Sequence, residues 1–320
     1  MKYLITGGAG FVGSHLVDRL LEEGHQVLVL DDFSTGSRNN LAHHSSNSNL
    51  QLTEGSILDS RLVDSMVRQS DRVLHLAAAV GVFNIVRKPL ESLRINIKGS
   101  ENLFEASLLH KKPILITSSS EVYGKNSADS LKEDDDRIVG APQKVRWSYS
   151  DAKAIDEAMA ISLHQQEGLE TRIVRLFNTV GPRQVGHYGM VVPRFVGSAL
   201  RDEPLEVYGT GIQTRCFGHV LDIVDAIIRV DRCTTLAGKP VNIGVDKEIS
   251  ILDLAKLVIK LSQSRSEIKF KKYADAYSAG FEDMERRVPD NSLLKTETGW
   301  NSSRNIEQII KDVAQFINDK

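Results

Sequence analysis

The feature that most constrains the fold of this sequence is a glycine-rich turn between a short apolar run and an amphipathic stretch. Gly7, Gly10 and Gly13 follow the apolar residues 3–6 and open a segment with helical spacing. In this context the first glycine allows a tight turn, the second lets the backbone approach a pyrophosphate, and the third lets the helix pack closely on the sheet. The alternative is a glycine turn without a ligand, which the flanking pattern disfavours. The sequence therefore predicts a dinucleotide-binding turn made by Gly7, Gly10, Phe11, Val12 and Gly13.

Apolar runs alternate with helical patterns through the first half of the chain. Such alternation is typical of a parallel sheet with helices on both faces. We therefore expect an α/β fold with a Rossmann-like, doubly wound parallel sheet. The expected strands are residues 3–6, 27–31, 73–77, 114–118 and 171–177, and the expected helices are 13–23, 61–69, 89–109 and 149–167.

The pattern changes after Asn178, where glycine and proline interrupt the regular alternation. We expect a cofactor-binding domain over residues 1–178 and a smaller C-terminal α/β substrate lobe over residues 179–320, with segments near 215–245 returning to the first domain. Residues 43–49 are rich in Ser, Asn and His and are expected to form a surface loop. Later elements are expected as helices over 218–230, 251–262 and 306–317 and a strand over 240–244.

The composition argues against several classes of partner. The 320 residues carry a formal net charge of −2, which predicts no attraction to nucleic acid or to an anionic membrane. Cys216 and Cys233 are the only cysteines, and neither has ligands nearby at metal-binding spacing, so we expect neither a disulfide framework nor a metal site. The sequence shows no apolar run typical of a signal peptide or a membrane span, and we therefore expect a cytoplasmic protein.

Two adjacent carboxylates predict which dinucleotide is bound. Asp31 and Asp32 end the second expected strand, eighteen residues beyond Gly13. A carboxylate at this place accepts hydrogen bonds from the adenosine ribose hydroxyls and repels a 2′-phosphate. The sequence therefore favours NAD over NADP, with Asp31 as the main ribose ligand; the alternative is a pair of solvated loop acids.

A tyrosine and a lysine four residues apart predict acid–base chemistry. Tyr149 and Lys153 share one face of an expected helix, where the ammonium is predicted to lower the pKa of the phenol and make it a base for a sugar hydroxyl. In isolation such a pair is more often a surface pair. Ser119 and Ser120 follow an apolar strand, so they are expected at the carboxyl edge of the sheet, within reach of the reacting oxygen.

Taken together, these elements resemble the extended branch of the short-chain dehydrogenase/reductases, which comprises mainly nucleotide-sugar epimerases, dehydratases and decarboxylases. The resemblance covers nearly the whole chain. It rests on residues 7–13, 74–78, 119–124, 149–153, 174–183 and 207–215.

The resemblance also implies roles for further residues. It places Ser56 and Ile57 at the adenine, and Leu76, Ala77 and Ala78 beside the cofactor. Related proteins often have Asp where this chain has Ser56, which weakens that contact. On the substrate side it implies that Asn178, Arg215 and Arg287 hold a sugar diphosphate, with Arg183, Val191 and Val207 as further substrate contacts; an ordinary surface arginine is the alternative for Arg183.

Within this branch the sequence points to more than one reaction. Residues 189–195 and 280–289 resemble UDP-glucose or UDP-glucuronate 4-epimerases, and we take 4-epimerisation of UDP-glucose/UDP-galactose or UDP-glucuronate/UDP-galacturonate as the main hypothesis. Glu121 and Arg287, together with residues 138–150, are also similar to UDP-glucuronate decarboxylases, which is the alternative. A 4,6-dehydratase of dTDP-glucose type is disfavoured, because Ser120 stands where those enzymes carry an Asp.

Two further expectations concern catalysis and assembly. A non-catalytic NAD-binding scaffold is the rival class, and the intact pair of Tyr149 and Lys153 argues against it. Residues 89–109 and 149–167 carry apolar side chains on more than one side, and related proteins dimerise through these helices. We therefore expect a homodimer, with buried packing inside one chain as the alternative.

Overall fold

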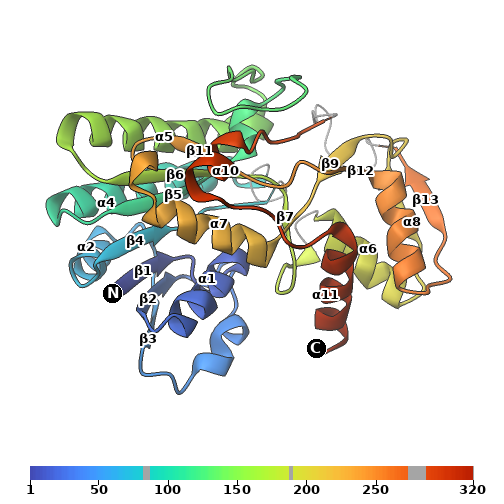
Figure 1. Ribbon diagram of the computed structural model, residues 1–320, viewed down its shortest axis with the longest axis horizontal. Coiled ribbons are helices and arrows are strands. Elements are labelled where there is room, and N and C mark those ends of the chain that lie inside the picture. The colour runs from blue at the N-terminus through green and yellow to red at the C-terminus, as the bar shows by residue number, and fades with distance from the viewer. Residues whose placement is uncertain (82–86, 187–189, 273–285, 320) are drawn as a thin grey trace.

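The computed structural model describes residues 1–81, 87–186, 190–272 and 286–319. Within these ranges a seven-stranded sheet forms the centre of the molecule (Figure 1). All its pairings are parallel, and β1 lies between β2 and β4. This confirms the predicted α/β class. In spatial order the strands are β11 (Pro240–Ile243), β6 (Thr171–Leu176), β5 (Ile114–Ser119), β4 (Arg72–His75), β1 (Lys2–Thr6), β2 (Gln26–Asp31) and β3 (Leu50–Glu54).

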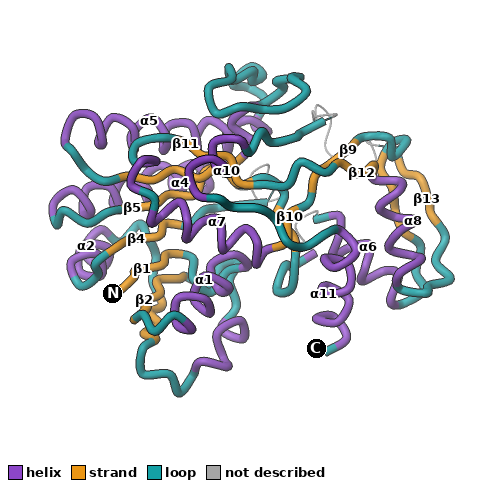
Figure 2. The backbone as a smooth tube through the Cα atoms, in the orientation of Figure 1, coloured by secondary structure: helices purple, strands orange, loops and turns teal. Residues whose placement is uncertain are grey.

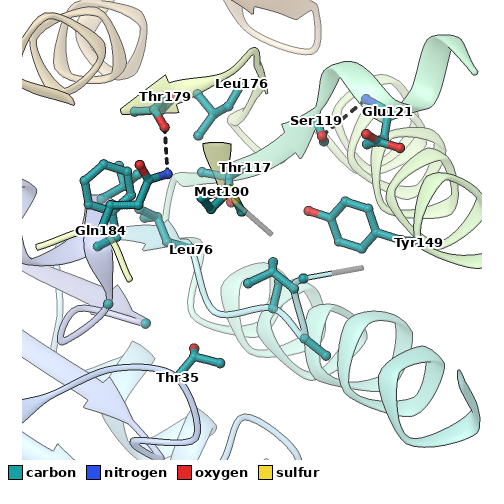
Figure 3. A pocket seen from close by; sticks show the side chains of 18 of the residues that line it. Thr35, Leu76, Thr117, Ser119, Glu121, Tyr149, Leu176, Thr179, Gln184 and Met190 are labelled. Atoms are coloured by element: carbon teal, nitrogen blue, oxygen red, sulfur yellow. Dashed lines mark hydrogen bonds between the residues drawn. The ribbon is translucent and has the colours of Figure 1, made fainter. Parts of the chain in front are cut away.

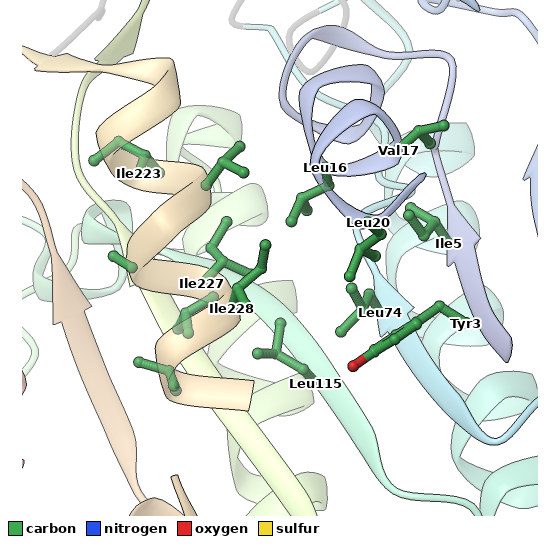
Figure 4. Packing of buried hydrophobic residues seen from close by; sticks show 14 of the residues in the cluster. Tyr3, Ile5, Leu16, Val17, Leu20, Leu74, Leu115, Ile223, Ile227 and Ile228 are labelled. Atoms are coloured by element: carbon green, nitrogen blue, oxygen red, sulfur yellow. The ribbon is translucent and has the colours of Figure 1, made fainter. Parts of the chain in front are cut away.

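Helices cover both faces of this sheet, which explains why its central strands are apolar without interruption. Tyr3 and Ile5 of β1 pack against Leu16 on one face, as Figure 4 shows. Leu4 points to the other face and packs in a cluster with Leu103. One face is covered by α1 (Phe11–Glu22) and α7 (Val220–Arg232), and the other by α2 (Ser60–Arg68), α4 (Pro89–Leu109) and α5 (Ser148–Glu167).

A smaller lobe lies beside the main sheet (Figure 2). It has its own apolar core. Phe195, Leu254 and Ile310 bring three helices together there: α6 (Val191–Leu200), α8 (Ile251–Leu261) and α11 (Ile306–Asn318). Short strand pairs complete the lobe and its connection to the first half. They are β8 (Leu205–Tyr208) with β13 (Ile268–Lys271), β9 (Thr214–Cys216) with β12 (Glu248–Ser250), and β7 (Thr179–Val180) with β10 (Gly218–His219).

The chain crosses back to the main sheet after β10. α7 contacts α1, β11 extends the sheet beside β6, and the short helix α10 (Ser292–Thr298) packs on both returning elements. The boundary at residue 178 stays a prediction, because the structure shows packing between segments and does not divide the chain.

One strand was missed and one boundary was wrong. β3 was not predicted because it is a half-buried edge strand with polar residues along it. Residues 45–49 form turns, as expected of a loop, but His43 and His44 end the short helix η1 (Arg38–His44), which Leu41 anchors in the core. None of the helices in the described ranges is long and apolar enough to cross a membrane.

Candidate active site

The glycine turn between β1 and α1 leaves no room for side chains at two of its positions. Gly7 has a φ of +71°, and a Cβ on it would lie 2.8 Å from the backbone nitrogen of Ala77. A Cβ on Gly13 would lie 2.2 Å from the carbonyl oxygen of Gly7. Gly13 therefore lets α1 approach the turn itself rather than the strands behind it. The start of α1 presents backbone without side chains to a large cavity at this edge of the sheet, and this fits a bound pyrophosphate.

Replacing Gly13 with alanine is expected to weaken NAD binding about tenfold or more. The added methyl group forces the backbone at Gly7 to move, and a backbone shift of this kind costs about 1–3 kcal/mol. Calorimetric titration with NAD measures the effect. Gly197→Ala is the matched control, because the nearest atom to its Cβ is 3.6 Å away and the residue lies inside α6. Equal NAD affinity in the Gly13 variant and the unmodified chain would contradict this role.

Asp31 and Asp32 lie near the glycine turn in the same cavity but differ in exposure. Asp31 is buried, and its carboxylate accepts hydrogen bonds from the backbone N–H groups of Ala9 at 2.9 Å and Phe33 at 2.8 Å. Burial raises the pKa of Asp31, although these two hydrogen bonds oppose the rise. Asp32 is exposed, and its carboxylate accepts a hydrogen bond from the backbone N–H of Ser34. Asp31 thus also holds the glycine turn in place, a role that the sequence did not predict.

A cavity of about 740 Å³ extends from the glycine turn across the carboxyl ends of the main sheet to the smaller lobe. A volume of this order is typical of ligand sites. Figure 3 shows the hydroxyl of Tyr149 pointing into the cavity, with Ser119 and Glu121 on the same side. The cavity brings together most of the predicted residues: Gly7, Gly10, Phe11, Val12, Gly13, Asp31, Asp32, Ile57, Leu76, Ala77, Ala78, Ser119, Ser120, Glu121, Tyr149, Asn178, Val191, Arg215 and Arg287.

Four predicted residues do not line this cavity. The Ser56 hydroxyl accepts a hydrogen bond from the backbone of Leu58, and Lys153 is buried behind the cavity wall. The side chain of Val207 is fully buried in the core of the smaller lobe, so it is not a substrate contact. Arg183 contacts Asp18 on α1 at 2.8 Å. Its role as a substrate contact is therefore not supported by its position, and the residues expected at 189 and 280–285 lie outside the described ranges.

Tyr149 and Lys153 both belong to the first half of α5, as predicted. Lys153 is only 2% exposed, and its Nζ lies 3.2 Å from Oδ2 of Asp156. Burial raises the pKa of Tyr149, whereas the ammonium of Lys153 and a hydrogen bond with Ser119 act to lower it. The prediction that Lys153 sets a lowered pKa was therefore incomplete, because burial outweighs its effect. The positive charge of an oxidised nicotinamide acts in the same direction as Lys153.

Glu121 is held between two arginines at the side of the cavity next to Tyr149. Its carboxylate lies 2.7 Å from Nη2 of Arg287 and 2.5 Å from Nη1 of Arg146. Arg287 also donates to the Ser120 hydroxyl at 3.2 Å. Burial alone would raise the pKa of Glu121, but Arg287 and Arg146 lower it to about 2. The cluster therefore holds two positive charges and one negative charge in a buried setting.

Arg146 is the main site residue that the sequence analysis did not assign. Its only signal was its place three residues before Tyr149, in the stretch that resembles decarboxylases. A short helix, η3 (Val145–Trp147), runs directly into α5 and turns the Arg146 side chain toward Glu121, which η2 (Ser120–Tyr123) presents after β5. The pairing joins segments 25 residues apart, and no local pattern predicts it.

Comparisons with known proteins identify the family of the chain. The family model described as GDP-mannose 4,6 dehydratase matches residues 4–313. The UDP-N-acetyl-alpha-D-glucosaminuronate decarboxylase of Bacillus cytotoxicus is 39% identical over 319 residues, which cover 99% of this chain and 98% of that protein. UDP-glucuronic acid decarboxylase 1 of Danio rerio is 35% identical over 98% of this chain and 72% of that protein.

Solved structures of related enzymes share the fold along the whole chain. The UDP-glucuronic acid 4-epimerase of Bacillus cereus, in complex with UDP-glucuronic acid and NAD, aligns with a TM-score of 0.89 at 26% identity and covers 100% of this chain and 99% of its own. The UDP-glucose 4-epimerase of Thermotoga maritima with UDP-glucose gives a TM-score of 0.89 at 28% identity, with the same coverage. With its glycine turn, its Tyr149–Lys153 pair and a family match over nearly its full length, the chain belongs to the GDP-mannose 4,6 dehydratase-like family of extended short-chain dehydrogenase/reductases.

Proposed function

We propose that this protein is an NAD-dependent decarboxylase that acts on a UDP-linked uronic acid. The observation that carries the proposal is the buried cluster of Glu121, Arg146 and Arg287 beside Tyr149. Its two guanidiniums are planar donors suited to binding a carboxylate. The C6 carboxylate of a uronic acid can accept hydrogen bonds from both of them, whereas the C6 hydroxyl of glucose carries no charge to pair with them.

The two guanidiniums of this cluster favour a uronic acid as substrate, and the relatives favour decarboxylation over 4-epimerisation. The enzymes that are 34–39% identical to the chain are named decarboxylases of UDP-uronates. The compared epimerases are 26% and 28% identical. We therefore rank the 4-epimerase, which was the main hypothesis from sequence, below the decarboxylase. Ser120 stands where a dTDP-glucose dehydratase carries an Asp, so elimination of water lacks its acid.

The residues around the cavity supply the steps of such a reaction. NAD, held by the glycine turn and Asp31, supplies the redox chemistry at C4 of the sugar when it is bound. Tyr149 accepts the proton from the C4 hydroxyl, and Lys153 stabilises the phenolate. The resulting 4-keto sugar is a β-keto acid, so the bond from C5 to the carboxylate breaks and carbon dioxide leaves. The enolate that remains takes up a proton from water at C5. Arg287 and Arg146 position that carboxylate, and the 4-keto group is reduced again at the end, so the overall reaction is redox-neutral.

Two parallel incubations test this function and its substrate. Purified protein is supplied with UDP-glucuronate or with UDP-N-acetylglucosaminuronate, and the sugar products are resolved by mass spectrometry and NMR. We expect at least one of them to give a pentose product that is lighter by one carbon dioxide. A product of unchanged mass with inverted C4 would establish the 4-epimerase instead. UDP-glucose serves as the control, because it has no carboxylate to lose.

The outer surface of α4 and α5 supports the proposal of a homodimer. Leu109 is 71% exposed, Leu90 is 62% exposed and Ile155 is 43% exposed. A cavity of about 310 Å³ between the two helices is lined by Phe104 and other residues of both. Exposed apolar surface of this kind is typical of a protein interface.

Light scattering after gel filtration tests the dimer. We expect twice the 35.5 kDa mass of one chain, and a shift toward one chain in Ile155→Glu. The control is Ile212→Glu, which places the same charge on the smaller lobe, where Ile212 is 75% exposed. A mass of 35.5 kDa for the unmodified protein would contradict the dimer.

A further inference from the structure

Lys153 has an acidic neighbour that the acid–base mechanism does not use. Asp156 lies three residues beyond Lys153 on α5, so both side chains point to the same side of the helix. The Nζ of Lys153 and Oδ2 of Asp156 are 3.2 Å apart, and each side chain is only 2% exposed. A contact between two opposite charges at this depth is only weakly screened by solvent.

Glu157, the other acid on this side of α5, pairs with residues of the neighbouring strands. Glu157 accepts two hydrogen bonds from Arg175 of β6, at 2.9 and 2.7 Å, and one from Ser118 of β5 at 2.5 Å. Its charge is therefore compensated by Arg175. Among the residues that the structure describes, the cation that pairs with Asp156 is Lys153 and not an arginine.

The other groups near Lys153 and Asp156 are neutral or have their charge compensated by arginines. From β4, His75 is fully buried, and burial and the charge of Lys153 lower its pKa to about 3, so that it is neutral. From α4, the Ser100 hydroxyl faces Asp156. From η2, Glu121 faces Tyr149, but Arg146 and Arg287 compensate its charge. The charges that act on Tyr149 are, in order of effect, those of Lys153, Glu121 and Asp156, and of the two acids only Asp156 contacts Lys153.

We propose that Asp156 is a positioning residue of the active site. It holds the Lys153 ammonium behind Tyr149, and its negative charge partly offsets the electrostatic effect of that ammonium on the phenol. Its carboxylate orients the flexible lysine side chain, which has three rotatable donors. The same negative charge disfavours the phenolate form of Tyr149. Asp156 therefore sets how readily Tyr149 gives up its proton. This inference rests on the proposed function, because it assigns Tyr149 as the base.

Asp156→Asn separates the charge from the shape of this side chain. The amide oxygen still accepts a hydrogen bond from Lys153, so the lysine keeps a partner and its place. Removal of one negative charge near the phenol favours its ionisation. We expect the ionisation of Tyr149 to move to lower pH by about one unit, as does the acid limb of kcat. Asp156→Ser, which also lacks the charge but is smaller, is expected to move it in the same direction.

The ionisation of Tyr149 is measured directly by ultraviolet titration of the phenolate band in protein saturated with NAD. The chain has seven tyrosines, so each protein is titrated against its own Tyr149→Phe version and the difference is used. The matched control is Asp151→Asn, which removes the same charge from α5 at a side chain that is 45% exposed and pairs with Arg137. We expect its shift to be much smaller, because solvent screens it.

An unchanged Tyr149 ionisation in both Asp156 variants, or an equal shift in Asp151→Asn, would overturn the proposal. A role confined to structural stability moves the thermal midpoint but leaves the titration in place. The titration needs no sugar nucleotide, so a wrong assignment of the substrate does not affect it. Conversely, a wrong assignment of Asp156 leaves the release of carbon dioxide by the unmodified protein unaffected.

Discussion

Replacing Tyr149 with phenylalanine is expected to lower kcat by about a thousandfold. The change removes one oxygen atom, and with it the group that exchanges the proton with the C4 hydroxyl. General acid–base catalysis by a positioned side chain contributes about 10²–10⁴-fold, and the hydroxyl of Tyr149 points into the cavity beside Ser119 (Figure 3). The loss is expected with any UDP-sugar, because the step at C4 precedes the step at C6.

Two controls show that such a loss comes from chemistry. NAD affinity, measured by calorimetry, is expected to change little, since the glycine turn and Asp31 are predicted to provide the main cofactor contacts. The thermal midpoint of unfolding is expected to stay close to that of the unmodified protein, because the ring remains in place. A variant that keeps more than a tenth of the original kcat would remove Tyr149 from its role as the base.

Replacing Arg287 with glutamine is expected to lower kcat/KM for the UDP-uronate by about a hundredfold, which corresponds to about 3 kcal/mol. Arg287 is buried and holds both Glu121 and Ser120. Without its guanidinium the cluster loses one of the two cations that are proposed to hold the substrate carboxylate. The matched control is Arg286→Gln, since Arg286 is 42% exposed and pairs with Glu248 and Asp129 away from the cluster.

The affinity for UDP alone distinguishes two roles of Arg287. If Arg287 acts on the sugar carboxylate, as we propose, the Kd of UDP changes far less than kcat/KM for the uronate. If it acts only on the diphosphate, as the resemblance to the family implied, UDP and the UDP-uronate lose affinity equally. This second result would remove the main observation behind a carboxylated substrate.

Local patterns predicted the positions of the residues that we assign to the cofactor, and most of them line one cavity. The spacing of Gly7, Gly10 and Gly13 fixes a backbone shape, and Asp31 stands at the end of a strand whose position follows from the apolar pattern. Tyr149 and Lys153 lie on one helix, so their spacing alone brings them together. The predictions succeeded where a single element carries the whole geometry.

The substrate half depends on contacts between distant segments, and there the sequence was less informative. Arg287 meets Glu121 across 166 residues, and the partner of Arg183 turned out to be Asp18 of α1. A residue type does not reveal whether an arginine points into a cavity or to a neighbouring helix. Val207 was predicted as a substrate contact from the motif around it, but alternation along β8 turns its side chain into the core.

The pKa of Tyr149 shows a similar limit. The sequence predicts the effect of Lys153, because the two residues are neighbours on a helix. It does not predict the burial of the phenol, which raises the pKa, or the charge of Asp156, which acts in the same direction as burial. These contributions depend on what packs around α5, and they appear only once the sheet and the helices are assembled.

The most direct test of the account follows the carboxylate carbon itself. UDP-glucuronate and UDP-N-acetylglucosaminuronate, each labelled with carbon-13 at C6, are incubated with the unmodified protein, and labelled carbon dioxide and sugar nucleotides are measured together. The account predicts that, with the true substrate, one labelled carbon dioxide is released for each pentose product formed, and that Tyr149→Phe releases almost none. Label that remains entirely in a UDP-uronate with inverted C4 would contradict it.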